Sequence, residues 1–103
     1  MKLKIWLYFL SQKRISIEVV IRSAATVHEA IGFILYQVAE EGKEEIKCDD
    51  VNCYSLRIVE DDGSIDEDFP AIDRKRRLEK FSFKQYALCI DTSKIAAASI
   101  NLP

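Results

Sequence analysis

The densest set of ionisable side chains in this chain is an acidic segment at residues 60–73, which holds seven carboxylates and no basic residue. The next four residues, 74–77, are all basic. Like charges at this density repel one another and resist burial, so we expect a solvated loop that presents two opposite fields side by side. Such a surface attracts a basic partner and speeds the encounter in a salt-dependent way. Plain solvated surface is the alternative, although a loop this long favours a functional role.

Three apolar residues interrupt the charge of this segment: Ile65, Phe69 and Ile72. An apolar residue held inside a charged loop either packs its side chain into the domain's own core or serves as an anchor for a partner. The sequence leaves both roles open for each of the three.

The carboxylates give little support for a metal or acid–base site. A calcium loop placed around Gly63 would take its first ligand from Ile58, which has no side-chain oxygen. Paired carboxylates for acid–base work need a pocket that separates their pKa values, and a solvated loop supplies none. A magnesium site is conceivable from four carboxylates, without further support in the sequence: Asp61, Asp62, Asp66 and Asp68.

The histidine and cysteine residues also give little support for nucleophilic or redox chemistry. The only histidine, His28, is expected on the surface, and one histidine supports no Ser/His/Asp or Cys/His site. The three cysteines, Cys48, Cys53 and Cys89, form no C-x-x-C pair and lack zinc partners. Their odd number argues against a disulfide framework and for a reducing compartment. We therefore expect neither a cofactor nor an enzyme activity.

Length and composition indicate one soluble globular domain. The chain has 103 residues, of which 49% are hydrophobic and 31% charged. The net charge of −2 provides no overall basic field, which argues against nucleic acid as a partner. The N-terminal apolar run at residues 5–10 is short for a signal core and lacks a cleavage site, so it is interpreted as a strand. No run reaches membrane-spanning length.

The elements that must position the acidic segment follow from periodicity. Residues 2–10 are apolar on both faces, which predicts a central strand covered on both sides. Residues 15–21 alternate, which predicts a second strand with one wet face, paired antiparallel with the first. Thr26 and Glu29 predict a capping box, and Gly42 predicts the end of the helix. An apolar stripe between them should pack on the sheet: Val27, Ala30, Ile31, Ile34, Leu35 and Val38.

The second half predicts two more strands, at 54–59 and 83–90, with the acidic segment leaving the first of them. Residues 78–81 predict one helical turn that fixes the far end of the segment to the core. This order predicts an α+β fold, a ubiquitin-like β-grasp with one main helix on a mixed sheet and a protruding acidic loop. We expect the domain to cover residues 1–92 and a short tail to cover 93–103.

Resemblance to a known family rests on several stretches: Tyr54 to Gly63, then Asp66, Asp68-Phe69-Pro70, Asp73 and Lys80-Phe81-Ser82-Phe83, with Ala30-Ile31-Gly32 and Glu41-Gly42 in the helix. They resemble the conserved-region-in-the-middle (CRIM) domain of the stress-activated MAP kinase-interacting protein 1 family, the Sin/Avo subunit of target-of-rapamycin complex 2. The similarity covers residues 4–90, and its acidic motif is fairly specific.

The resemblance implies a non-catalytic module whose acidic loop recruits AGC-family kinases (Akt, SGK and protein kinase C types) for phosphorylation by the complex. Other subunits of the complex are implied as further partners. Residue by residue, the implied partner-binding set is Glu60, Asp61, Asp62, Asp66, Glu67, Asp68, Phe69, Pro70, Ile72 and Asp73. The basic run 74–77 departs from the expected pattern and could narrow the acidic surface or change partner preference.

The resemblance further implies a fragment of a longer cytoplasmic protein, whose other domains supply membrane association. We expect this domain to be monomeric in isolation and not to bind membranes directly. Two other functions stay open. A small GTPase could bind the edge of the second strand, through Lys13, Arg14 and Arg22. Alternatively, the domain could be purely architectural and dock into its complex without recruiting anything.

Overall fold

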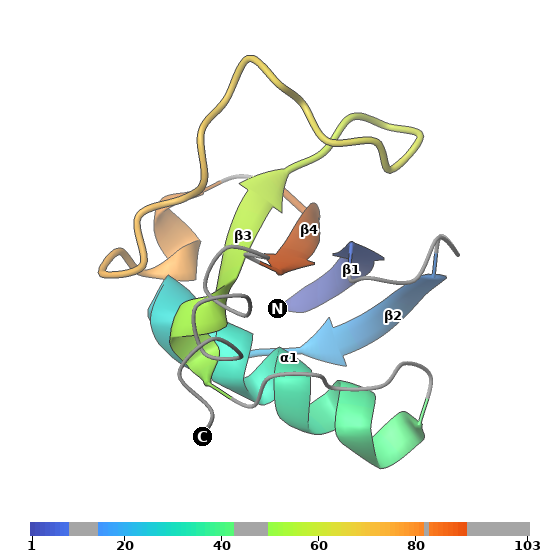
Figure 1. The fold of residues 1–103 in the computed structure, drawn as a ribbon. Coiled ribbons are helices and arrows are strands. Elements are labelled where there is room, and N and C mark those ends of the chain that lie inside the picture. Colours follow the sequence, from blue (N-terminus) through green and yellow to red (C-terminus); the bar gives the residue numbers. More distant parts are fainter. Residues whose placement is uncertain (9–14, 43–49, 82, 91–103) are drawn as a thin grey trace, which may run out of the picture.

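The computed structural model describes residues 1–8, 15–42, 50–81 and 83–90. The elements follow one another along the chain (Figure 1) as β1 Lys2–Tyr8, β2 Ile15–Val20, α1 Val27–Glu41, the 3₁₀ helix η1 Val51–Cys53, β3 Tyr54–Ile58, the 3₁₀ helix η2 Leu78–Lys80 and β4 Gln85–Ile90. The predicted α+β class, with one main helix on a mixed sheet, is confirmed.

The four described strands form one sheet in the order β2-β1-β4-β3. β1 pairs antiparallel with β2 and parallel with β4, while β3 pairs antiparallel with β4. The parallel pair at the centre requires the chain to cross over, and α1 lies within that connection. Figure 1 shows α1 along one side of the sheet. This topology is compatible with the predicted β-grasp.

Helix α1 begins and ends as its sequence predicts. The side-chain oxygen of Thr26 accepts from the backbone N–H of Glu29 at 3.2 Å, and the Glu29 carboxylate accepts from the backbone N–H of Thr26 at 3.1 Å. Gly42 ends the helix with φ 64°, in the left-handed region that glycine adopts without a steric penalty. All six residues of the predicted apolar stripe are buried.

The core lies between this stripe and one face of the sheet. Alternate residues of each strand point into it, so Ile5, Ile17, Leu56 and Leu88 are at most 2% exposed. Fully burying side chains of this size stabilises the fold by about 1.5–3 kcal/mol each. The opposite face of the sheet is called the open face below.

The open face is only partly covered, and here the prediction for β1 was half right. Trp6 and Tyr8 are partly buried, whereas Lys2 and Lys4 on the same face are exposed. Strand β1 is therefore central, but its second face is covered only toward its C-terminal end. Phe9 and Leu10, which were expected to extend this strand, lie outside the described residues.

Other boundaries shift slightly. The last strand begins at Gln85 rather than at Phe83, and the helical turn predicted at 78–81 is confirmed as η2. Cys48 and the expected tail lie outside the described residues. Among the described residues, no helix is long and apolar enough to cross a membrane.

Candidate functional site

The acidic loop, residues 60–73, begins with a tight turn that its own backbone closes. Val59 and Ile65 form an isolated antiparallel bridge. The N–H of Glu60 donates to the carbonyl of Ser64 at 2.8 Å, and the Asp62 carboxylate accepts from the backbone N–H and the hydroxyl of Ser64 at 3.0 and 2.6 Å. The first half of the loop is thus an ordered hairpin-like turn.

The tip of this turn rests on the open face of β1. The Tyr8 hydroxyl donates to the carbonyl of Gly63 at 2.6 Å. Gly63 is buried with φ 87°, and a Cβ at this position would lie 2.5 Å from Cε2 of Trp6. A glycine is therefore required both for the backbone conformation and for the close approach to the indole ring.

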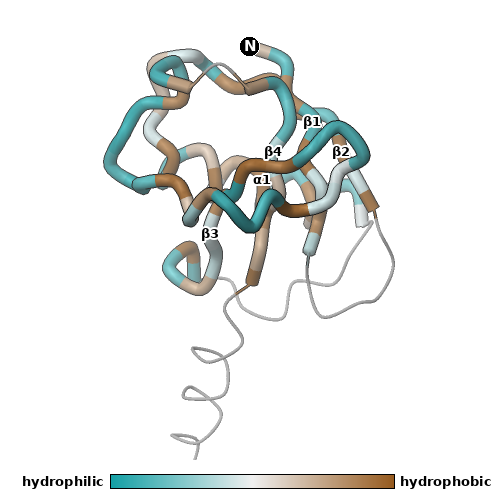
Figure 2. Tube along the Cα trace, turned by 90° about the horizontal axis from the view of Figure 1, so that it is seen from above, coloured by the Kyte–Doolittle hydropathy of each residue, from teal (hydrophilic) through white to brown (hydrophobic). Residues whose placement is uncertain are grey.

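The second half of the loop returns along the outer edge of β3. The N–H of Asp66 donates to the carbonyl of Ile58 at 3.0 Å, and the N–H of Ile72 donates to the carbonyl of Leu56 at 2.9 Å. The loop rises beyond the end of β3 in Figure 1, and it is mostly hydrophilic with a few apolar residues in Figure 2. It protrudes, as predicted, but it is tied to the sheet at several points.

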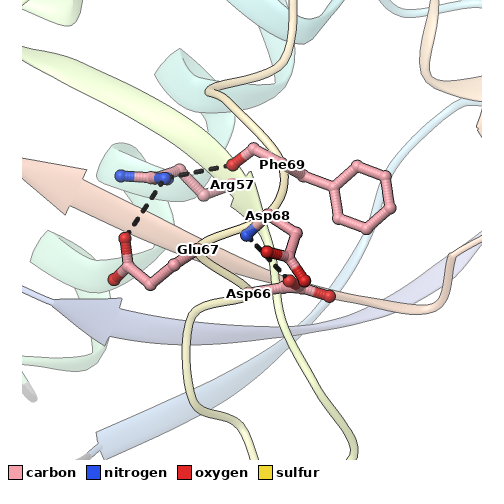
Figure 3. Close-up of polar contacts among 5 residues, drawn as sticks. All are labelled: Arg57, Asp66, Glu67, Asp68 and Phe69. Carbon is pink, nitrogen blue, oxygen red and sulfur yellow. Dashed lines mark hydrogen bonds and ion pairs between the residues drawn. The ribbon is translucent and has the colours of Figure 1, made fainter.

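Arg57 of β3 holds the middle of the loop from beneath (Figure 3). Its Nη2 donates to the carbonyl of Phe69 at 3.1 Å and lies 3.9 Å from the Glu67 carboxylate. The Glu67 side chain is 82% exposed, so solvent screens this ion pair and the hydrogen bond to the backbone is the firmer contact. The Nε of Arg57 is buried and has no hydrogen-bond partner among the described residues, which adds a desolvation cost.

Sequence analysis did not include Arg57 in the site. Its position could be inferred only from the alternation of buried and partly buried residues in β3, which puts Arg57 on the face opposite Tyr54, Leu56 and Ile58. That pattern locates Arg57 on the open face but does not reveal which segment crosses it.

The predicted site residues divide by exposure. Ile72 is only 7% exposed and packs in the core. Phe69 is 45% exposed, and its ring points away from Arg57 in Figure 3. Asp66 is partly buried, and its carboxylate accepts from the backbone N–H of Asp68 at 3.0 Å. The other members are exposed: Glu60, Asp61, Asp62, Glu67, Asp68, Pro70 and Asp73.

An apolar groove of about 380 Å³ lies beside Phe69. Ile58, Pro70, Ile72 and Phe81 contribute to its lining. The structure therefore brings together a set of outward carboxylates, one exposed aromatic ring and a shallow apolar groove. This combination suits contact with a basic polypeptide surface that carries an apolar side chain.

The basic run is less basic at the surface than its four residues suggest, because Arg74 turns inward. Its guanidinium donates to the carbonyl of Val51 at 2.6 Å and to the carbonyl of Tyr54. Its Nε lies 3.4 Å from Nδ1 of His28, a surface residue as predicted. Arg74 thus fixes the C-terminal end of the acidic loop to the start of β3.

The remaining cations of the run are exposed and partly neutralised. Arg76 lies 3.9 Å from the Asp73 carboxylate, and Arg77 lies 3.8 Å from the Glu79 carboxylate. Lys75 is exposed. The positive field beside the acidic loop is therefore weaker than four consecutive basic residues suggest.

The described residues provide little for catalysis. Burial raises the pKa of the Cys89 thiol to about 11, and the nearby Arg57 lowers it by a smaller amount. A thiol in that state is a poor nucleophile at neutral pH. No group of three or more His, Cys, Asp or Glu residues in the described part of the chain is arranged to hold a metal ion.

The alternative site for a small GTPase is only partly visible. Strand β2 lies at one edge of the sheet, and Arg22 just after it is exposed. Lys13 and Arg14, the other two residues of that hypothesis, lie outside the described residues.

Among the curated proteins that this chain resembles, two are named "Target of rapamycin complex 2 subunit MAPKAP1". The chain is 45% identical over 64 residues to the Gallus gallus protein and 41% identical over 76 residues to the Xenopus tropicalis protein. These alignments cover 62% and 74% of this chain but only 12% and 15% of the relatives. The chain thus spans a small part of the length of the curated proteins it matches.

Among solved structures, the chain is similar to one chain of the "MycP5-free ESX-5 inner membrane complex, State II". The TM-score is 0.49 at 10% identity, and the match covers 99% of this chain and 27% of that chain. A likeness at this level has no bearing on function.

The family comparison is decisive, because one model matches residues 1–98, nearly the whole chain. Its description is the middle CRIM domain of SAPK-interacting protein 1 (Sin1). The match spans the sheet, the helix and the acidic loop described above. This chain therefore belongs to the CRIM-domain family of SAPK-interacting protein 1.

Proposed function

We propose that this chain is a non-catalytic recruitment module of target-of-rapamycin complex 2, which binds AGC-family kinases through the acidic loop. The mechanism is local concentration. A weak contact with the loop holds the substrate kinase near a catalytic subunit, so that phosphorylation becomes effectively intramolecular. The other subunits of the complex are the second class of partner, and the cytoplasm is the proposed location.

The observation that carries this proposal is the ordering of the acidic loop with its carboxylates outward. Backbone hydrogen bonds at Glu60, Gly63, Asp66 and Ile72 fix its path. Among the described residues, no hydrogen bond or ion pair engages the exposed carboxylate of Asp61. Because the loop is already ordered, it loses less conformational entropy when a partner binds than a disordered segment would.

Charge and apolar contact have different roles in this proposal. Exposed carboxylates mainly raise the association rate and select for basic partners, with a strong dependence on salt. The Phe69 ring and the groove beside it prolong the bound state, because buried apolar anchors dominate dissociation rates. Ile72, being buried, contributes by holding the loop in place.

Family membership also supports the proposal. The curated relatives are named as subunits of target-of-rapamycin complex 2, and this chain covers 12–15% of them. A part of that size suits a module within a larger protein. The finer assignment, to AGC-family kinases and to this loop, is ours.

The test is a binding measurement between the chain and a purified AGC-family kinase domain. The loop variant is the double substitution Asp61→Asn and Asp68→Asn, which keeps side-chain shape and removes two exposed carboxylates. The control is Glu40→Gln with Glu41→Gln at the exposed end of α1, which changes the net charge equally.

We expect the loop variant to bind roughly 2- to 30-fold more weakly, because exposed charge pairs contribute about 0.2–1 kcal/mol each. The control should bind like the original chain, and both should keep its melting temperature. Equal weakening in both variants would reduce the effect to net charge, and unchanged binding in both would contradict the proposal.

A further inference from the structure

A second groove, of about 650 Å³, lies at the end of the sheet where β1 and β4 begin. Its charged rim is mostly positive, because it includes three lysines, Lys2, Lys4 and Lys84, and one acidic residue, Glu18. Its apolar walls include Phe81 and Phe83. We call it the lysine groove.

The lysines are not neutralised by firm contacts. Lys2 lies 3.3 Å from the Glu18 carboxylate, but both side chains are about two-thirds exposed (70% and 66%), so water screens the pair. The ammonium of Lys4 lies 4.5 Å from the centre of the Trp6 ring, a contact that leaves its positive charge uncancelled. Lys84 is exposed. The rim is therefore suited to an anionic partner.

The groove also carries an exposed aromatic ring in a fixed orientation. Phe83 is 41% exposed, and its ring meets that of Tyr86 edge-on, with 6.3 Å between centroids. Tyr86 is buried, so it provides a rigid support. An exposed aromatic side chain that is already held in place is a favourable anchor, because little side-chain entropy is lost on contact.

We propose that the lysine groove binds an acidic polypeptide segment that carries an aromatic side chain. The carboxylates of that segment contact the lysine rim, and its ring packs against Phe83. This goes beyond the proposed function, because the partner has the opposite charge to one that binds the acidic loop.

A polypeptide fits the groove better than an anionic membrane. Phe81 lines both the lysine groove and the groove beside Phe69, so the two surfaces are adjacent. A flat anionic bilayer that approached the lysines would also meet the carboxylates of the acidic loop, and the repulsion would oppose binding. A narrow peptide can contact the lysines alone.

The test is an NMR titration of the complete 103-residue chain with a synthetic peptide that has one phenylalanine between aspartates and glutamates. One control peptide replaces the phenylalanine with alanine, and another replaces the acidic residues with lysine. We expect shifts at residues 2–4 and 83–85 with the first peptide, about tenfold weaker binding with the second, and none with the third.

Two variants and a matched control locate the contact. Lys84→Glu and Phe83→Ala should each weaken binding of the acidic peptide about 3- to 10-fold. Lys75→Glu makes the same charge change outside the groove and should leave the affinity within twofold. Because Phe83 and Lys84 are exposed, we expect both variants to fold, which a melting curve checks.

Several results would overturn the proposal. Shifts elsewhere on the chain, or equal weakening by Lys75→Glu, would mean non-specific charge attraction. Stronger binding to phosphatidylserine vesicles than to the peptide would make the groove a membrane contact. Concentration-dependent self-association that Lys84→Glu abolishes would make the acidic loop of a second copy the occupant.

Discussion

Adding one methyl group at Gly63 tests whether the acidic loop is seated on the sheet. In Gly63→Ala the new Cβ would lie 2.5–2.8 Å from three atoms of the Trp6 ring. The ring cannot yield easily, because its Nε1 donates to the Gln85 side chain at 3.0 Å. Gly42→Ala is a matched control, because Gly42 also has positive φ but has nothing within 4 Å of the added Cβ.

The two substitutions share one cost and differ in another. Both place alanine in the left-handed region, which costs about 1–2 kcal/mol. Only Gly63→Ala adds overpacking, which typically costs a further 1–3 kcal/mol. We therefore expect the free energy of unfolding to fall by about 1–2 kcal/mol for Gly42→Ala and by about 2–5 kcal/mol for Gly63→Ala.

The assay is urea unfolding followed by the fluorescence of Trp6, the only tryptophan of the chain. It reports global unfolding and also responds to the loop that covers the indole. If the loop lifts from the sheet instead of straining the fold, the native-state emission of Gly63→Ala should shift to the red. Equal destabilisation of the two variants, with unchanged native emission, would refute the contact between the loop and the sheet.

Three further predictions concern the helix cap, the apolar residues of the acidic loop and a partly buried thiol. Thr26→Ala should lower the free energy of unfolding by about 0.5–2 kcal/mol in urea unfolding. Hydrogen bonds from the backbone N–H and the hydroxyl of Thr26 lower the pKa of Glu29, so their stabilisation is complete above pH 4.5 and is lost as the pH falls through the folded pKa. Thr26→Ala keeps the backbone bond, and the hydroxyl caps the Glu29 N–H at any pH, so acid titration should narrow the difference between the two chains without closing it. Ile72→Ala should cost about 2–5 kcal/mol because the side chain is buried, whereas Phe69→Ala should cost little stability in the same assay and reduce kinase binding. Partial burial raises the pKa of Cys89 to about 11, so peptide mapping after alkylation at pH 8 should find it modified far more slowly in the folded chain than in urea; equal labelling rates in the two states would contradict the raised pKa.

Local patterns predicted the parts of the fold that depend on neighbours in sequence. The capping box at Thr26 and Glu29 and the glycine at position 42 are confirmed as the ends of α1. Each signal works because the interacting groups are at most four residues apart. The apolar periods of α1 and of β3 likewise locate the buried faces.

The seating of the acidic loop could not be predicted in this way. Its key contacts join Gly63 to Tyr8, 55 residues apart, and, directly after the loop, Arg74 to Val51, 23 residues apart. The charge density predicts a freely solvated loop, and this prediction is correct for the exposed carboxylates. The prediction of a solvated loop does not hold for Gly63 and Ile72, which are buried. Gly63 packs on the indole ring of Trp6, and the N–H of Ile72 donates to the carbonyl of Leu56 at the edge of the sheet.

The basic run shows the same limit. The sequence places four consecutive cations after the acidic loop and does not distinguish among them. In the structure, Arg74 instead donates hydrogen bonds to the carbonyls of Val51 and Tyr54, both far away in sequence. Composition counts charges but does not tell which of them serve the fold.

The measurement that tests the central proposal most directly is an NMR titration of this chain with a purified AGC-family kinase domain, at low and moderate salt. The account predicts shifts concentrated at residues 60–73, including Phe69, that weaken as salt rises. Shifts centred instead on β2 and Arg22, or no shifts at either salt concentration, would contradict recruitment through the acidic loop.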